Sequence, residues 1–132
     1  VDEGLRIELS ESNDNIFFEI GTATLKEKAR LLLEKIGNYL SKLPNKLIIE
    51  GHTDSRPYSG DGSGYTNFEL SADRANSARR ALAVSNPSLL NQIEEIRGYA
   101  DKKLRDQNDP FNVVNRRISI IVKFTEKDKK VL

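Results

Sequence analysis

The chain has 132 residues, with 21 basic and 20 acidic side chains, one histidine and no cysteine. This length fits one domain with its own core, and the near balance of charge gives no overall attraction to nucleic acid or anionic lipid. Without cysteine, disulfides, thiol nucleophiles and cysteine-ligated zinc are excluded.

The sequence contains no run of about 20 apolar residues, the length that a membrane-spanning helix needs. No signal-like segment leads it, and it begins with valine rather than methionine. We therefore expect the chain to be a piece of a longer protein, whose membrane anchor or export signal would precede Val1.

The first predicted elements are a strand and a long helix. Leu5, Ile7 and Leu9 alternate with charged residues, which is the period of a half-buried strand. The sequence Thr24-Leu25-Lys26-Glu27 has the capping-box pattern of a helix start, and an apolar stripe follows it up to Pro44. The stripe consists of Leu25, Ala29, Leu32, Leu33, Ile36, Leu40 and Leu43.

A second strand and helix follow, separated by a loop. The continuous apolar run at 47–49 favours a central strand, which ends in Gly51-His52-Thr53-Asp54. Residues 55–66 contain Pro and Gly, and we expect an exposed, mobile loop. A cap at Thr66 or Asn67 begins the next helix. The predicted packing side of this helix carries Phe68, Ala72, Ala75 and Leu82.

The last part of the chain predicts two more strands. Charged residues among the apolar ones at 93–99 indicate an edge strand, and 118–124 alternates most clearly. We expect an α/β (α+β) fold with one mixed four-stranded sheet and two long helices packed on it. The N-terminal strand and an acidic lead-in would occupy 1–24, the core 25–124, and a charged tail 125–132.

Asp54 and Arg74 form the first candidate site. A carboxylate at the carboxyl end of a strand and a guanidinium early in the next helix converge where open α/β sheets bind ligands. An Asp at a turn more often accepts bonds from downstream amides, so Asp54 alone is ambiguous. Because side chains alternate along a strand, one of Arg116 and Arg117 can join the pair. Both signs of charge together suit a zwitterion, whose carboxylate an arginine grips with two bonds.

His52 raises two alternatives. His52 and Asp54 supply only two metal ligands, and no other His or Cys remains to complete a set. A small hydrolase that uses the same two residues lacks a recognisable nucleophile motif. The simpler interpretation is a strand histidine hydrogen-bonded to a neighbouring backbone group. Nucleic-acid binding has little support, because basic residues are not interleaved with exposed aromatics.

Four motifs in order resemble the OmpA-like peptidoglycan-binding domain family. They are Gly51-His52-Thr53-Asp54, Asn67-x-x-Leu70-Ser71-x-x-Arg74-Ala75, Gly98-Tyr99, and Asn115-Arg116-Arg117 before the last strand. The resemblance spans residues 5–124, nearly the whole chain. Within the family, the details are similar to the periplasmic domain of flagellar motor stator subunits. These details are Pro57, the extended loop that ends in Tyr65-Thr66-Asn67-Phe68-Glu69-Leu70-Ser71, and Asp73.

The resemblance implies a function and an address. It implies a non-catalytic anchor, without cofactor or metal, in the periplasmic domain of an inner-membrane protein. It also implies a homodimer and an ion-channel partner subunit, reached through an N-terminal membrane segment that is absent here. The alternative is an outer-membrane or lipoprotein anchor to the cell wall. The implied ligand is the diaminopimelate-containing stem peptide of peptidoglycan, held by Asp54, Arg74 and Arg116 in a pocket lined by Thr53, Asn67, Leu70 and Asn115.

The chain departs from the family pattern in two places. Asn112-Val113-Val114 stands where the family often has Gly-Arg-Ala, and Ala100 follows Gly98-Tyr99 where a third residue is frequently glycine. We expect both changes to flank the pocket. Their predicted effect is either a weaker affinity or a loop that needs rearrangement or partner contacts before it binds.

Overall fold

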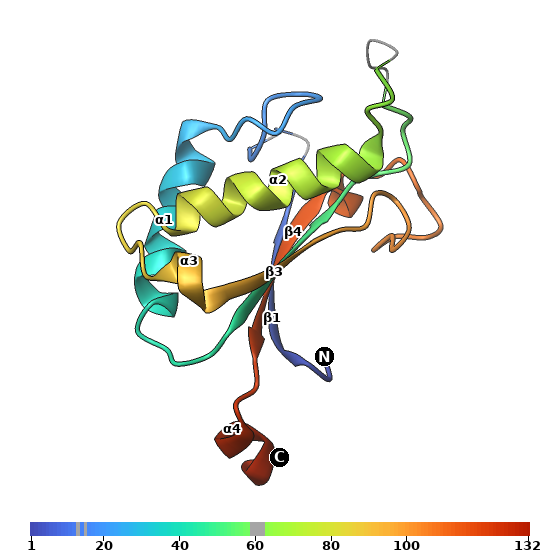
Figure 1. The fold of residues 1–132 in the computed structure, drawn as a ribbon. Helices are drawn as coiled ribbons and strands as arrows, with labels where there is room; N and C mark the ends of the chain where they lie inside the picture. Colours follow the sequence, from blue (N-terminus) through green and yellow to red (C-terminus); the bar gives the residue numbers. More distant parts are fainter. Residues whose placement is uncertain (13, 15, 59–62) are drawn as a thin grey trace.

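A computed structural model describes residues 1–12, 14, 16–58 and 63–132 (Figure 1). Part of the loop expected at 55–66, including Gly60 and Gly62, lies outside the described residues. The helices and strands are β1 (Gly4–Ser10), α1 (Glu27–Leu40), β2 (Leu47–His52), α2 (Asn67–Leu82), α3 (Leu89–Gln92), β3 (Ile93–Gly98), the 3-10 turn η1 (Val113–Asn115), β4 (Arg117–Lys123) and α4 (Glu126–Val131).

The four strands form one mixed sheet in the order β1-β4-β2-β3. β4 runs antiparallel to both β1 and β2, while β2 and β3 are parallel. The fold class is confirmed, as are the inner position of β2 and the edge position of β3. β4 takes the other inner place because its residues are apolar toward both faces, with Ile120 and Ile121 both fully buried.

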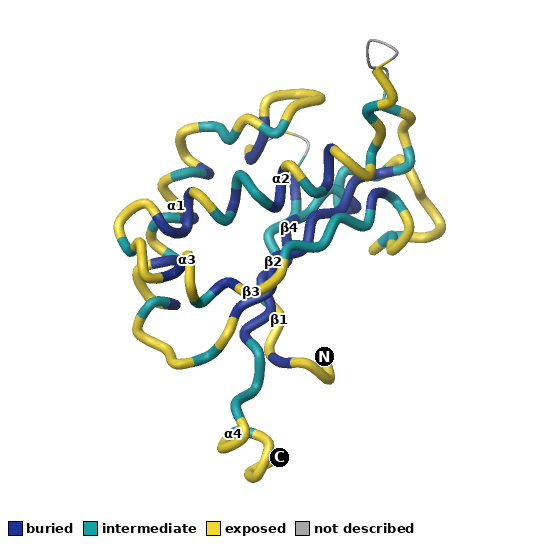
Figure 2. Tube along the Cα trace, in the orientation of Figure 1, coloured by how far each residue is buried: buried dark blue, intermediate teal, exposed yellow. Residues whose placement is uncertain are grey.

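Helix α2 packs on one face of this sheet, and α1 packs against α2 on the same side (Figure 1). The core lies between them and the inward residues of β2 and β4, where Leu47, Ile49 and Ile120 are completely buried (Figure 2). Small residues on α2 allow its backbone to approach the sheet closely. At Gly51, an added Cβ would lie 2.0 Å from the carbonyl oxygen of Ser71, so this contact requires glycine.

The start of α1 differs from the prediction, because the capping box at Thr24 does not form. Instead Leu25 pairs with Phe18 in an isolated β-bridge, and the backbone N–H of Lys26 donates to the Phe17 carbonyl at 2.8 Å. This pairing holds the chain extended, so the helix begins only at Glu27, without a side-chain cap.

The prediction of which residues each long helix buries was partly wrong. Leu32 and Leu43 in or after α1 are both 42% exposed, and Phe68 in α2 is 50% exposed. The predicted stripe of α1 is confirmed at Ala29, Leu33 and Leu40, and Gly37 joins this buried line. Because α2 presents small residues to the sheet, bulky Phe68 at its first turn lies outside the core.

The predicted cap of α2 is confirmed at Thr66. Its side chain accepts a hydrogen bond from Phe68, and the Glu69 carboxylate accepts one from the Thr66 backbone N–H at 2.8 Å. We expect Thr66→Ala to lower the free energy of unfolding by about 1 kcal/mol, because an orphan amide loses its acceptor. Urea denaturation at neutral pH measures this change. An unchanged unfolding midpoint would show that the box contributes nothing to stability.

Residues 125–132, expected as a charged tail, contain the short exposed helix α4. Thr125 and Asp128 form a second capping box at its start, with the Thr125 hydroxyl accepting from Asp128 N–H at 3.0 Å. Both chain ends lie at the end of the sheet where β2 begins (Figure 1). Among the described residues, no helix has the length and apolar character to cross a bilayer.

The sheet face opposite the two long helices carries charged side chains. Strand alternation directs Glu50 and His52 of β2 to this face, where Glu50 accepts hydrogen bonds from Arg6 at 3.1 Å, Arg97 at 3.1 Å and Tyr99 at 3.2 Å. His52 stacks on Tyr99, with 5.1 Å between ring centroids, and its Nε2 lies 3.9 Å from Glu50. The expected backbone partner of His52 is wrong, because its Nδ1 has no hydrogen-bond partner among the described residues.

Candidate functional site

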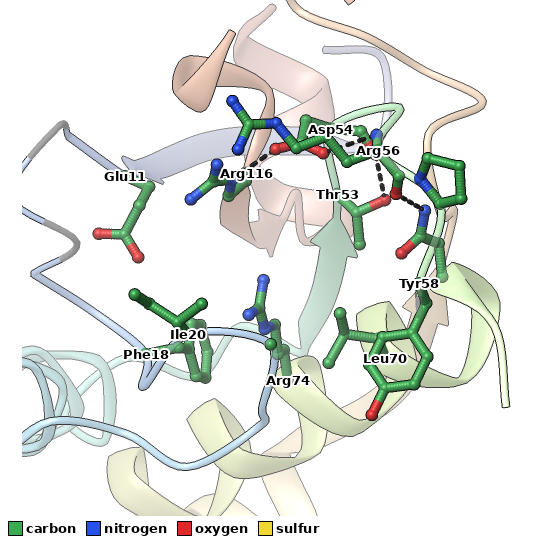
Figure 3. A pocket seen from close by; sticks show the side chains of 13 residues that line it. Glu11, Phe18, Ile20, Thr53, Asp54, Arg56, Tyr58, Leu70, Arg74 and Arg116 are labelled. Carbon is green, nitrogen blue, oxygen red and sulfur yellow. Dashed lines mark hydrogen bonds and ion pairs between the residues drawn. The ribbon is translucent and has the colours of Figure 1, made fainter. Parts of the chain in front are cut away.

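A cavity of about 230 Å³ lies at the end of the sheet where β2 ends and β4 begins (Figure 3). Its walls come from four regions: the segment between β1 and α1, the loop after β2, the first turns of α2, and the residue just before β4. Six of the seven predicted site residues line it. The full lining consists of Glu11, Phe18, Ile20, Gly21, Thr53, Asp54, Arg56, Pro57, Tyr58, Asn67, Leu70, Arg74 and Arg116.

Asp54 lines this cavity, is buried, and has a donor on each carboxylate oxygen. Oδ1 accepts from the Arg56 backbone N–H at 2.8 Å, and Oδ2 accepts from Nε of Arg116 at 2.6 Å. The first bond is the ordinary turn role of an aspartate, and the second is a charge-assisted bond to a residue beside it. Asp54 is therefore both a turn residue that accepts from a downstream amide and a charged group that lines the pocket.

Arg74 reaches the cavity from α2 and is 7% exposed. Its Nε donates to the Thr22 carbonyl at 2.8 Å, and its guanidinium carbon lies 4.7 Å from the centre of the Phe18 ring. Burial and the positive charge of Arg116 lower the pKa of Arg74, while Glu11 and Asp54 oppose that change. Arg74 forms no ion pair with a described carboxylate, so an incoming anionic group would relieve a buried cation.

Arg116 and Arg117 point in opposite directions, as strand alternation predicts. Arg116 enters the cavity beside Asp54. Arg117 turns to the other face, where its Nε donates to Glu8 at 2.8 Å and its Nη2 donates to the Lys103 carbonyl at 2.8 Å. Only one of the two arginines therefore belongs to the site.

Thr53 and Asn67 shape the loop around Asp54. The Thr53 hydroxyl donates to the Asp54 carbonyl at 2.9 Å, and the Asn67 amide donates to the Arg56 carbonyl at 2.8 Å. Leu70, which is 5% exposed, supplies an apolar part of the wall. These residues hold the turn that presents Asp54 to the cavity.

Asn115 is the predicted site residue that the structure does not bring to the cavity. It is fully buried, its Oδ1 accepts from Asp106 N–H at 2.8 Å, and its Nδ2 donates to the Asp109 carbonyl at 3.0 Å. Both bonds cross the loop between β3 and β4. Asn115 therefore fixes the loop that precedes Arg116, and acts on the site through that position.

The two departures from the family pattern also lie outside the cavity lining. Ala100 has φ = 53°, a left-handed conformation that glycine adopts at lower cost, and its N–H donates to the Ser71 hydroxyl at 3.0 Å. Asn112 caps η1, with its side chain accepting from Val114 N–H at 2.9 Å. Both positions contribute to backbone geometry near the pocket.

The sequence analysis missed the wall formed by Glu11, Phe18 and Ile20. One signal was available for Glu11, since it continues the alternation of Ile7 and Leu9 toward the helices. Phe18 and Ile20 belong to a segment with no regular period, so their positions depend on contacts with α2 far along the chain.

Known proteins are similar to this chain in sequence and in fold. The sequence profile of the OmpA family matches residues 17–118. Motility protein B of Escherichia coli K12 is 37% identical over 132 residues, which are 100% of this chain and 42% of that protein. The chain therefore spans less than half of that relative.

Two solved structures have a similar fold. The periplasmic domain of Helicobacter pylori MotB superposes with a TM-score of 0.75 at 24% identity, over 99% of this chain and 90% of that chain. The cell wall anchor of the T6SS from Pseudomonas aeruginosa superposes with a TM-score of 0.74 at 20% identity, over 91% of this chain and 81% of that chain.

Proposed function

The chain belongs to the OmpA family, and on this premise we propose that it binds peptidoglycan and anchors its parent protein to the bacterial cell wall without catalysis. The observation that carries the proposal is the meeting of Asp54, Arg74 and Arg116 in one cavity. A buried arginine beside an Asp–Arg pair offers both signs of charge to a small zwitterionic group.

The ligand in this proposal is the diaminopimelate end of a peptidoglycan stem peptide. Arg74 and Arg116 bind its carboxylate, and Asp54 accepts from its ammonium group. Thr53 and Asn67 keep the Asp54 turn in place, and Leu70 contacts the aliphatic part of the side chain. Asn115 contributes by fixing the loop that precedes Arg116.

The position of the chain ends supports an anchoring role. The ends of the chain lie where β2 begins, and Asp54 follows the end of the same six-residue strand. A strand of that length spans about 20 Å, so a tether at one end leaves the pocket free at the other. An anchor needs this separation between its attachment to the parent protein and its binding site for the cell wall.

We further propose that the parent is a stator subunit of the flagellar motor, similar to Motility protein B. In this role the chain is a periplasmic domain connected to an inner-membrane span. It forms a homodimer, and its parent protein assembles with an ion-channel partner subunit. Identity of 37% over the whole chain supports it. The alternative is an outer-membrane or lipoprotein anchor, which the fold shared with the cell wall anchor of the T6SS also suits.

Sedimentation with purified cell-wall sacculi tests the binding function. We expect the domain to pellet with sacculi that contain diaminopimelate and to be released by a soluble stem peptide ending in that residue. A domain that stays in the supernatant with such sacculi contradicts the proposal.

A chimera tests the stator role. Residues 1–132 replace the matching part of Motility protein B in an E. coli strain that lacks the native subunit, and we expect swimming to be restored. A chimera that accumulates and pellets with sacculi, yet supports no swimming, favours the alternative parent.

A further inference from the structure

Glu11 lies at the point where β1 runs into the pocket. Its backbone N–H donates to the Arg116 carbonyl at 2.8 Å, which extends the β1–β4 ladder by one step beyond Ser10. Along β1, Ile7 and Leu9 point toward the helices, and Glu11 is the next inward position. A carboxylate therefore stands where the strand pattern elsewhere places a core residue.

The Glu11 side chain is only 6% exposed, and Arg74 offsets its charge through space without direct contact. Its Oε1 accepts a hydrogen bond from the Phe17 backbone N–H at 3.0 Å, and it forms no ion pair with a described basic residue. A buried carboxylate normally has a cationic or multiple hydrogen-bonding partner. The cavity is the side from which such a partner can arrive.

The other charges of the pocket are distributed unevenly. Asp54 already has a donor on each oxygen and is paired with Arg116. Arg74 and Glu11 form no ion pair with described residues, although both line the same cavity. In Figure 3, Glu11 lies across the cavity from Leu70 and Tyr58, with Arg74 and Arg116 between them. Arg74 and Glu11 attract each other only through space. Each can therefore still take a direct partner of opposite charge from a ligand that carries both charges.

We propose that Glu11 is a second ammonium-binding carboxylate of the pocket and contacts the amino group whose carboxylate Arg74 binds. This inference rests on the proposed function and names a residue that selects the charged form of the ligand. The family profile begins at residue 17, so the match to the family does not include Glu11. The contact would make the site prefer a free amine over an acylated one, as in a crosslinked peptide.

A purely structural role for Glu11 makes a different prediction. If it only accepts from Phe17 and offsets the charge of Arg74, its loss weakens every ligand by the same factor. If it contacts the ammonium group, its loss weakens only ligands with a free amine. Glutamine separates the two roles, because it keeps a side-chain oxygen for the Phe17 amide and removes the charge.

The experiment is calorimetric titration with two probes, a stem tripeptide ending in meso-diaminopimelate and the same peptide with its side-chain amine acetylated. We expect Glu11→Gln to weaken the free-amine peptide by about tenfold and to leave the acetylated peptide nearly unchanged. Glu11→Asp, which keeps the charge, serves as a second variant and should retain part of the preference. Glu19→Gln is the matched control, because Glu19 lies in the same segment, is exposed and does not line the cavity.

The outcomes separate this inference from the proposed function. Two results overturn the inference and leave the proposed function standing. In both, the wild type binds; Glu11→Gln then either keeps the wild-type preference for the free amine or loses affinity equally for the two peptides. No wild-type binding to either peptide or to sacculi overturns the proposed function and the inference together. Loss of the free-amine preference in Glu11→Gln, with Glu19→Gln like the wild type, supports the inference.

Discussion

Replacing Arg74 with alanine is expected to weaken peptidoglycan binding by about 3 kcal/mol, which is roughly 150-fold in Kd. Arg74 is buried and forms no ion pair with a described carboxylate, so in the proposed complex the ligand carboxylate is its main anionic partner. The site then loses a charge-assisted contact that only the bound state forms. Sedimentation with sacculi at increasing protein concentration measures the change.

The Arg74 variants need controls for folding, because Nε also donates to Thr22 and the guanidinium lies over Phe18. Arg74→Lys keeps the charge and loses the planar fork, and we expect an intermediate affinity. Arg80→Ala removes an exposed arginine from the same helix and should bind like the wild type. Circular dichroism and a urea midpoint show whether each variant folds.

Asp54→Asn is the companion variant. It keeps a side-chain oxygen for the Arg56 amide and removes the charge that pairs with Arg116, so we expect a loss of similar size. Retention of both Arg74→Ala and Asp54→Asn at the wild-type level would remove the basis for the proposed site.

The centre of the pocket could be predicted from sequence because its residues follow regular elements. Asp54 follows a clear strand, Arg74 occupies a helix with a recognisable cap, and Arg116 precedes the strand with the clearest alternation. Since such elements converge at one edge of a sheet, their order along the chain was enough to bring these charges together.

The parts that could not be predicted depend on contacts between distant segments. Phe18 pairs with Leu25 and its ring contacts the guanidinium of Arg74. This pairing moves the start of α1 to Glu27 and forms one wall of the pocket. Asn115 has the residue type of a ligand contact, but the shape of the preceding loop turns it inward to Asp106 and Asp109. A motif gives the residue, and tertiary structure decides where its side chain points.

The charged sheet face also escaped prediction, since alternation shows which face a residue takes without showing its partners. Glu50 lies within the predicted central strand, and in the structure its carboxylate joins β1 to β3 through Arg6 and Arg97. Arg97 adds Glu3 at 2.7 Å and Glu95 at 2.9 Å, so three strands share one group of ion pairs. These ion pairs link the strands on the face opposite the helices, while apolar contacts link them on the face that the helices cover.

Stability is therefore expected to depend on Glu50 in acid. Burial alone would raise the pKa of Glu50, but His52, Arg97 and Arg6 together lower it from 4.5 to about 2. Burial lowers the pKa of His52, so its imidazole is neutral at pH 7 and the two arginines carry the charge interaction. A lowered carboxylate pKa stabilises the fold fully above pH 4.5, and this contribution is lost as the pH falls toward 2.

The expected size of this contribution is about 3 kcal/mol, from a pKa difference of roughly 2.5 units. Glu50→Gln should therefore be less stable than the wild type by about that amount at pH 7, since Arg6 and Arg97 lose a buried partner. The difference should shrink steadily between pH 4.5 and 2. Urea denaturation across this range measures it. Comparison with the wild type cancels the effect of Glu8. Burial alone would raise the pKa of Glu8, but Arg105 and Arg117 lower it rather than the partners of Glu50. Glu27→Gln, at an exposed pair with Arg30, should follow the wild type. A constant difference between Glu50→Gln and the wild type over the same range would place the acid sensitivity in other carboxylates.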